Sequence, residues 1–283
     1  MAGRFSRSWS LAGASWQVLK ADTQLMVFPL VSAIAALVVG GAFALGAFGL
    51  WSYDGLSQQS GDRIPANLYV LGFAFYVCLY FVMFFCNAAL VGAAMLRFDG
   101  GTPTVGDGFR IASARSGRIL GYALVAATVG MVLRAIQERV GFLGRIVVGL
   151  LGVGWTVATS MVVPVLVSHD VGPIDAVKES AGLLKKTWGE NVIGKGGLGL
   201  AFMLVYAAIF LCAGGLLFGA FSLGNLALVV TVAVLAVAAT ILAALAHAAL
   251  TGIYSAALYR YATTGSAGAG FDSGVLQAAF GRK

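Results

Sequence analysis

The residue best suited to chemistry in this sequence is His247, one of only two histidines. It lies in a long stretch without formal charge, and Thr240, Thr251 and Tyr254 follow helical spacing with it, at i−7, i+4 and i+7. An ionisable group at membrane depth is a functional candidate by default. The alternative is a neutral imidazole that hydrogen-bonds across a helix interface, and the absence of Asp and Glu from this stretch favours that structural role.

Three more polar residues, Asn87, Thr156 and Ser160, lie in two other apolar stretches. Inside a helix bundle they could meet the stripe around His247 and line a small polar cavity. As hydrogen bonds between helices they need no ligand. The sequence leaves both interpretations open. The candidate intramembrane polar residues are Asn87, Thr156, Ser160, Thr240, His247 and Thr251.

Other reactive patterns are missing from the sequence. The three cysteines, Cys78, Cys86 and Cys212, have no metal-ligand spacing, and packing is their expected role. There is no glycine-rich phosphate loop, no Ser/His/Asp spacing and no pair of intramembrane carboxylates. We therefore expect no catalytic residue, no metal ligand and no cofactor, and hence a protein that is not an enzyme.

The composition places these residues in a membrane. Of the 283 residues, 60% are apolar and 10% are charged, and the mean hydropathy is +0.92. A soluble domain carries about 25% charged residues. The composition excludes a soluble enzyme, a disulfide scaffold and a disordered chain. The net charge of +7 fits attraction to anionic lipid better than binding to nucleic acid.

The uncharged stretches between charged residues are long enough for six membrane-spanning helices. The longest holds 64 residues and must contain two spans, divided at the turn-forming segment Ser222–Asn225. The fold class is therefore all-α, a polytopic bundle in one membrane domain, 1–262. The expected spans are 26–50, 67–94, 118–138, 146–168, 198–221 and 226–259.

Basic residues predict the orientation of these spans. Fourteen of the 18 lysines and arginines fall in the terminal segments and in the loops after spans two and four. Such an excess marks the cytoplasmic side. The sequence thus predicts a multi-pass protein of the cytoplasmic membrane, with both termini in the cytoplasm. Residues 263–283 read as a Gly/Ser-rich linker with a short cytoplasmic tail.

Three segments on the predicted cytoplasmic side have amphipathic helical spacing: 4–20, 103–117 and 173–188. Thr102 and Pro103 are the expected start of the second. Each segment precedes a two-span hairpin, which suggests a threefold repeat, although short outer loops and longer inner loops produce the same rhythm in unrelated membrane proteins. Aromatic residues are the expected interfacial anchors, in contact with anionic lipid. These are Trp9, Trp16, Phe109 and Trp188.

Two prolines, Pro29 and Pro164, fall near the predicted cytoplasmic ends of spans one and four. Each removes a backbone donor and favours a bend. They are candidate hinges, either as structural kinks or as part of a gate.

Several stretches of the sequence are distinctive: Gly3–Ser10 with Val27–Leu30, Gly144–Gly152 with Val163–Val165, Leu258–Gly265, Gly270–Asp272, and Ala279–Phe280. With these stretches the chain resembles an uncharacterised family of prokaryotic six-span integral membrane proteins, a domain of unknown function, and the resemblance covers nearly the whole chain. It implies no catalytic residue. A looser likeness, in the rhythm of amphipathic helix and hairpin, is to membrane domains associated with glycerophosphodiester phosphodiesterases.

The expected function is a non-enzymatic scaffold or accessory subunit of a membrane assembly, or a self-associating oligomer. Its expected partners are itself or another membrane protein. One alternative is a transporter or channel for a small solute, with a path near Asn87, Thr156 and His247. Another is lipid binding at the cytoplasmic leaflet.

Overall fold

The computed structural model describes residue 13 and residues 16–56, 66–186 and 188–265. These residues form helices and no strand, and six helical segments are long and apolar enough to cross a membrane. The fold is an all-α polytopic bundle, as predicted. The elements are η1 (Thr23–Met26), α2 (Val27–Leu56), α3 (Ala66–Phe98), α4 (Val105–Ala114), α5 (Ser116–Arg139), α6 (Phe142–Ala158), α7 (Val162–Ser168), α8 (Pro173–Lys186), α9 (Trp188–Ser222) and α10 (Leu226–Thr264).

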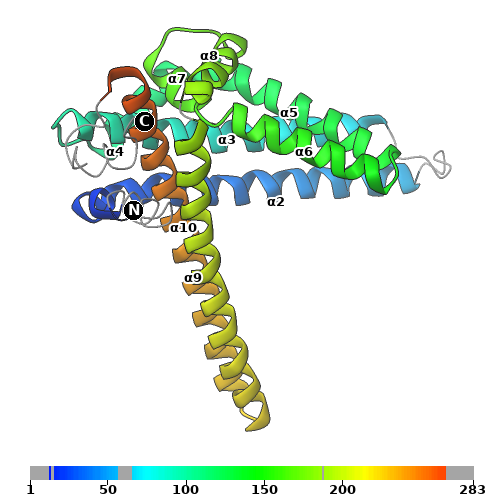
Figure 1. The fold of residues 1–283 in the computed structure, drawn as a ribbon. Helices are drawn as coiled ribbons and strands as arrows, with labels where there is room; N and C mark the ends of the chain where they lie inside the picture. Colours follow the sequence, from blue (N-terminus) through cyan, green and yellow to red (C-terminus); the bar gives the residue numbers. More distant parts are fainter. Residues whose placement is uncertain (1–12, 14–15, 57–65, 187, 266–283) are drawn as a thin grey trace.

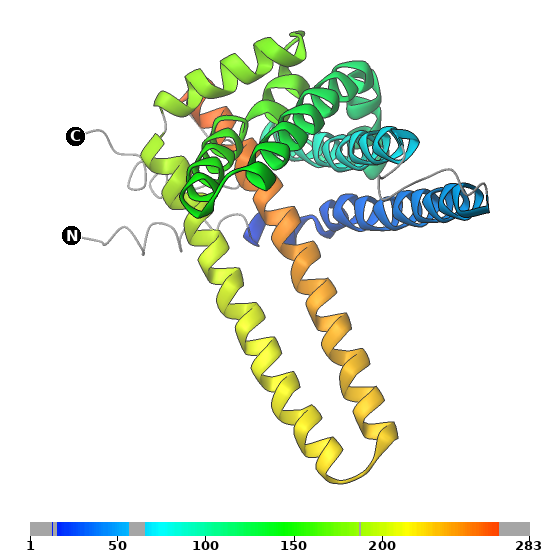
Figure 2. The same ribbon diagram turned by 90° about the vertical axis from the view of Figure 1, so that its right-hand side faces the viewer.

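Two parts of the fold point in different directions (Figure 1). Helices α2 to α8 form a body, in which α2, α3, α5 and α6 run alongside one another. The hairpin of α9 and α10, here called the arm, leaves the body at a steep angle (Figure 2). Its tip lies where the sequence predicts a turn: α9 ends at Ser222, and the Asn225 side chain caps α10 by accepting from the Leu228 N–H at 3.1 Å.

The arm is held by the last third of α10. Residues 249–259 are buried against the body, whereas most of α10 before them is exposed. Arg260 pairs with Asp99 beyond α3, with Nη1 and Oδ1 2.6 Å apart. Near it, the Tyr259 hydroxyl lies 3.4 Å from His169 Nε2, and His169 Nδ1 lies 2.8 Å from Glu179 of α8. These contacts fix the direction of the arm relative to the body.

Helix α4 packs closely on α3 because it presents a glycine. A Cβ at Gly108 would lie 2.5 Å from Phe28 Cζ and 2.7 Å from the Ala89 carbonyl oxygen. Phe109, a predicted lipid anchor, packs against Phe28 and Phe85, with ring centroids 5.2 Å and 6.2 Å away. The apolar face of α4 therefore contacts protein, but Phe109 is only half-buried, so its anchor role stays a prediction.

The start of α4 also differs from the prediction. Thr104, rather than Thr102, is the N-cap, and it forms a capping box with Asp107. The Thr104 hydroxyl accepts from the Asp107 N–H at 3.2 Å, and Asp107 Oδ2 accepts from the Thr104 N–H at 3.0 Å. A cap at Thr102 would put Val105 at the third position, where it could not reciprocate. The Thr104 N–H and hydroxyl lower the pKa of Asp107, so the box stays formed at neutral pH.

The fourth predicted span, 146–168, is not one helix. Helix α6 ends at Ala158 and α7 begins at Val162. Pro164 has no N–H for the carbonyl four residues earlier, so the helix cannot continue through it unchanged. Ser180 of α8 bridges the break: its hydroxyl accepts from the Met161 N–H at 3.1 Å and donates to the Ala158 carbonyl at 2.7 Å. Pro164 thus lies beside a real interruption, as the hinge prediction requires.

This bridge also sets which face of α8 is buried. The sequence pattern places Ile174 and Trp188 on the apolar face, but Ile174 is 62% exposed. The buried side chains are Ala176, Ser180, Leu183 and Leu184. Trp188 begins α9 instead of ending α8, because α8 stops at Lys186.

The other anchors have mixed outcomes. Trp16 is 43% exposed, with the Lys20 ammonium 5.5 Å from its ring centroid, in a segment that is helical over 16–21. Trp9, the Trp188 side chain and the tail 266–283 lie outside the described residues. Their predicted roles stay predictions.

Candidate functional site

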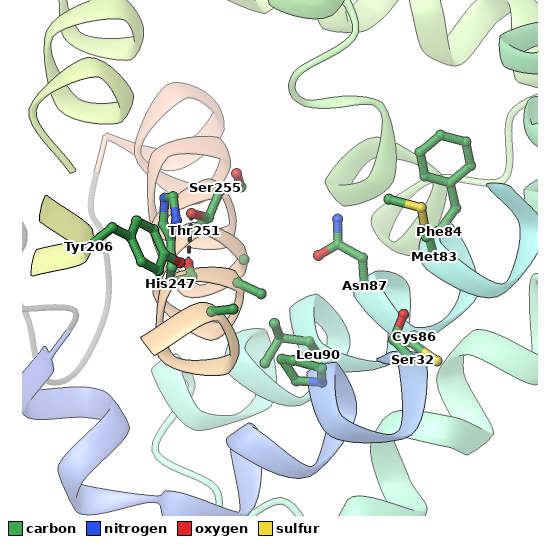
Figure 3. Close-up of a pocket in the computed structure, with 14 residues that line it drawn as sticks. Ser32, Met83, Phe84, Cys86, Asn87, Leu90, Tyr206, His247, Thr251 and Ser255 are labelled. Carbon is green, nitrogen blue, oxygen red and sulfur yellow. Dashed lines mark hydrogen bonds between the residues drawn. The ribbon is translucent and has the colours of Figure 1, made fainter. Parts of the chain in front are cut away.

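The main candidate site is a cavity of about 540 Å³ where the arm meets the body. One wall is α3 with the start of α2, and the other is α10 with a contribution from α9 (Figure 3). Its polar lining contains three of the residues singled out from the sequence, Asn87, His247 and Thr251. The complete polar set is Ser32, Asn87, Tyr206, His247, Thr251 and Ser255.

Asn87 projects from α3 into the space between the two walls (Figure 3). It is 11 residues before the end of α3 at Phe98, or about 16 Å along the helix axis, so it lies well inside the apolar segment. No hydrogen bond to its amide is found among the residues that the structure describes. Asn87 therefore offers both a donor and an acceptor to the cavity.

His247 lines the opposite wall of the cavity on α10, and aromatic rings of α9 pack against it. Its imidazole stacks on Phe202, with centroids 4.4 Å apart and an angle of 8° between the planes. The Tyr206 ring lies 6.4 Å away. Since Phe202 covers one face of the imidazole, polar contacts must be made at the ring edge, where a neutral imidazole has one donor and one acceptor.

The next turn of α10 continues the polar wall. The Thr251 hydroxyl donates to the His247 carbonyl at 2.8 Å, so its oxygen remains an acceptor towards the cavity. Ser255, 6% exposed, follows one turn later and lines the same cavity. Of the stripe predicted on α10, His247 and Thr251 line the cavity and Thr240 and Tyr254 do not, while Ser255, which was not predicted, does.

The rest of the lining is apolar. Met83, Phe84 and Leu90 of α3 stand opposite the small residues of α10. A Cβ at Gly252 would lie 2.4 Å from Leu90 Cδ2, so this glycine lets α3 and α10 cross closely at the cavity wall. A second cavity, of about 280 Å³ between α2 and α3, has only apolar lining and offers no chemistry.

Other predicted site residues lie elsewhere. Thr156 is on the exposed side of α6 and donates to the Gly152 carbonyl at 2.9 Å, and Ser160 lies in the break between α6 and α7. Thr240 donates to the Ala236 carbonyl at 2.8 Å and does not line the cavity. Thr156 therefore does not join Asn87 and His247 in the lining of this cavity.

The predicted hinge Pro29 also lines the cavity. It is in the first turn of α2, where the missing N–H has no helical partner to lose. Pro29 thus marks the change from η1 to α2 instead of kinking a helix.

Some lining residues were missed because their signal depends on packing. Ser255 could have been found by extending the stripe from Thr251 by one turn. Tyr206 lines the cavity and Phe202, one turn earlier on α9, stacks on His247, but nothing in the sequence pairs either of them with His247. Ser32 has no polar neighbour at helical spacing in α2.

The chemistry of the site is that of neutral hydrogen bonds in an apolar surround. None of the 14 lining residues is Asp, Glu, Lys or Arg. Within the described ranges, no three His, Cys, Asp or Glu side chains are grouped as metal ligands. The arrangement can hold a molecule with a polar end and an apolar remainder.

Comparison with known proteins gives one match. A family model described as "Family of unknown function (DUF6159)" matches residues 66–271, nearly three quarters of the chain. No curated protein and no solved structure matches. The looser likeness to membrane domains associated with glycerophosphodiester phosphodiesterases is not shown by these comparisons.

Proposed function

We propose that this chain, which belongs to the DUF6159 family of unknown function, is a multi-pass membrane protein that binds an amphiphilic molecule from the bilayer. The observation that carries the proposal is the meeting of Asn87 from α3 with His247 and Thr251 from α10 in one cavity of about 540 Å³. Small-molecule sites have volumes of about 300–1,000 Å³ and mostly apolar walls with few polar groups. The protein acts without catalysis, in the cytoplasmic membrane, with both termini in the cytoplasm.

The proposal differs from a transporter in what it requires of the structure. Transport of a small solute needs a polar path through the spans, and Thr156 lies away from Asn87 and His247. Binding needs only a site that opens to the bilayer. Lining residues on both walls are exposed, among them Met83 on α3 and Ala248 on α10.

A photolabelling experiment tests the binding. The purified protein in lipid nanodiscs is irradiated with a diacylglycerol that carries a diazirine in one acyl chain, and labelled peptides are identified by mass spectrometry. We expect labelling of 83–90 and 244–255, the two walls of the cavity. The substitution Ala248→Trp, which fills the cavity from an exposed lining position, should reduce this labelling at least fivefold.

The matched control is Ala238→Trp, on an exposed position of the same helix that does not line the cavity. It should leave the labelling unchanged. Uniform labelling of the exposed apolar surface, unaffected by Ala248→Trp, would overturn the proposed function.

Self-association through the arm is a second candidate function. It is favoured by the arm itself, whose side chains beyond the body are exposed and apolar on most sides, among them Leu211, Phe218 and Leu235. Lipid can cover such a surface, but the small residues of α9 also permit close helix contact. If the arm mediates assembly, Gly215→Leu should reduce disulfide-free chemical cross-linking of dimers in native membranes. A wild-type protein that is monomeric at all membrane concentrations would exclude this function.

Lipid contact at the cytoplasmic leaflet has less support. Exposed basic residues such as Arg110 could face anionic lipid, but Phe109 and the apolar face of α8 are occupied by protein contacts.

A further inference from the structure

The cavity between α3 and α10 is lined by six polar side chains but by no Asp, Glu, Lys or Arg, which limits the ligand. We infer that the ligand has a neutral, hydroxyl-bearing headgroup, as in a diacylglycerol or a long-chain alcohol, and no phosphate or ammonium group. This inference rests on the proposed function and adds the class of ligand to it.

Several charged residues pair with one another outside the cavity. Arg260 is paired with Asp99. Arg115 and Arg118, at the start of α5, both contact Asp170. None of these five residues lines the cavity. An ionic headgroup in the cavity would lose its hydration without gaining an opposite charge, which is strongly unfavourable. A hydroxyl group loses much less, because the cavity supplies hydrogen bonds.

The donor and acceptor pattern favours a hydroxyl over a carbonyl. Thr251 can only accept, because its proton is already donated to the His247 carbonyl. Asn87 can donate and accept on the opposite wall. A hydroxyl that donates to Thr251 while it accepts from Asn87 joins both walls, whereas a ketone, quinone or ester oxygen can only accept. A glycerol with one or two free hydroxyls satisfies more of these groups than any purely accepting headgroup.

The apolar lining accounts for the rest of such a molecule. Pro29, Met83 and Phe84 lie on the body side, and Ala244 and Ala248 lie on the arm side. Ala244 and Ala248 are exposed, so the cavity is open beside them. Acyl chains can leave the cavity there and continue into the bilayer, which needs no closed pocket large enough for a whole lipid.

Competition between lipids tests the inference. Labelling of 83–90 and 244–255 by the diazirine diacylglycerol is measured while unlabelled lipids with identical acyl chains are added: diacylglycerol, phosphatidic acid and phosphatidylcholine. We expect diacylglycerol to compete at a concentration at least tenfold lower than either phospholipid. In the variant Asn87→Leu, which keeps the side-chain size but removes both polar groups, that preference should fall to threefold or less.

Two controls keep the result interpretable. Thr240→Val removes a hydroxyl on the same helix outside the cavity and should leave the preference unchanged, and thermal unfolding of each variant establishes that it is folded. The variant His247→Phe should lose the preference for diacylglycerol to the same extent as Asn87→Leu. Equal competition by phosphatidic acid and diacylglycerol would overturn the inference while the proposed binding stands. Absence of site-specific labelling by any lipid would instead overturn the proposed function.

Discussion

The substitution Gly108→Ala is expected to destabilise the protein by about 1–3 kcal/mol, the usual cost of an overpacked core position. The added Cβ would lie 2.7 Å from the Ala89 carbonyl oxygen, and a backbone atom of α3 cannot move aside as a side chain can. In an exposed helix the same change stabilises by about 1 kcal/mol. The loss therefore reports the contact between α4 and α3. Thermal unfolding in detergent, followed by tryptophan fluorescence, measures it.

Gly106→Ala is the matched control, because Gly106 is in the same helix and is exposed. A Cβ there would meet only Thr104 Oγ1, at an ordinary 3.6 Å. The melting temperature should stay the same or rise. If both alanine variants shift the melting temperature equally, α4 does not pack on α3 as described, and it lies on the membrane surface as its amphipathic pattern alone suggests.

Charge spacing was sufficient to predict the long helices, because a hydrocarbon layer excludes charged residues regardless of which helices touch. The turn before Asn225 was also predictable, because glycine and asparagine favour turns through local backbone geometry alone. A bend near Pro164 was predictable for the same reason, but the support that it receives from Ser180 was not. Ser180 is distant in the sequence and reaches the break between Ala158 and Val162 only after α8 packs on it.

The residues of the candidate site also divide into those that one helix predicts and those that depend on packing between helices. His247 and Thr251 share one helix, so their common face followed from spacing alone. Asn87 was identified as a polar residue in an apolar span, but its position opposite His247 depends on the crossing of α3 and α10 at Gly252. Thr156 had an equal claim from the sequence, and it lies elsewhere because α6 does not border α10. Patterns within one helix are local, whereas the choice of neighbouring helices is not.

The length of α10 is consistent with a cavity at the junction of arm and body. With 39 residues the helix is about 58 Å long, far more than the roughly 30 Å of bilayer hydrocarbon. A helix of this length must tilt strongly or extend beyond the membrane. If arm and body tilt in opposite directions, they separate on one side of the bilayer and meet at the other. The ligand cavity then lies at their meeting point, beside lipid.

Ser180→Ala is expected to destabilise the protein by about 1–3 kcal/mol, because it leaves buried backbone groups without partners. The Met161 N–H and the Ala158 carbonyl both bond to this hydroxyl, and Ser180 is fully buried. Alanine fits the space and favours helix, so size and propensity cannot explain a loss.

The control is Ser113→Ala in α4, an exposed serine whose removal should change the melting temperature little. Amide hydrogen exchange gives a second readout, since Ser180→Ala should speed exchange at 159–162 more than elsewhere. A wild-type melting temperature with unchanged exchange would mean that the break between α6 and α7 needs no support from α8. In that case Pro164 alone ends the helix, and α8 is free to act as the surface helix that its sequence pattern predicts.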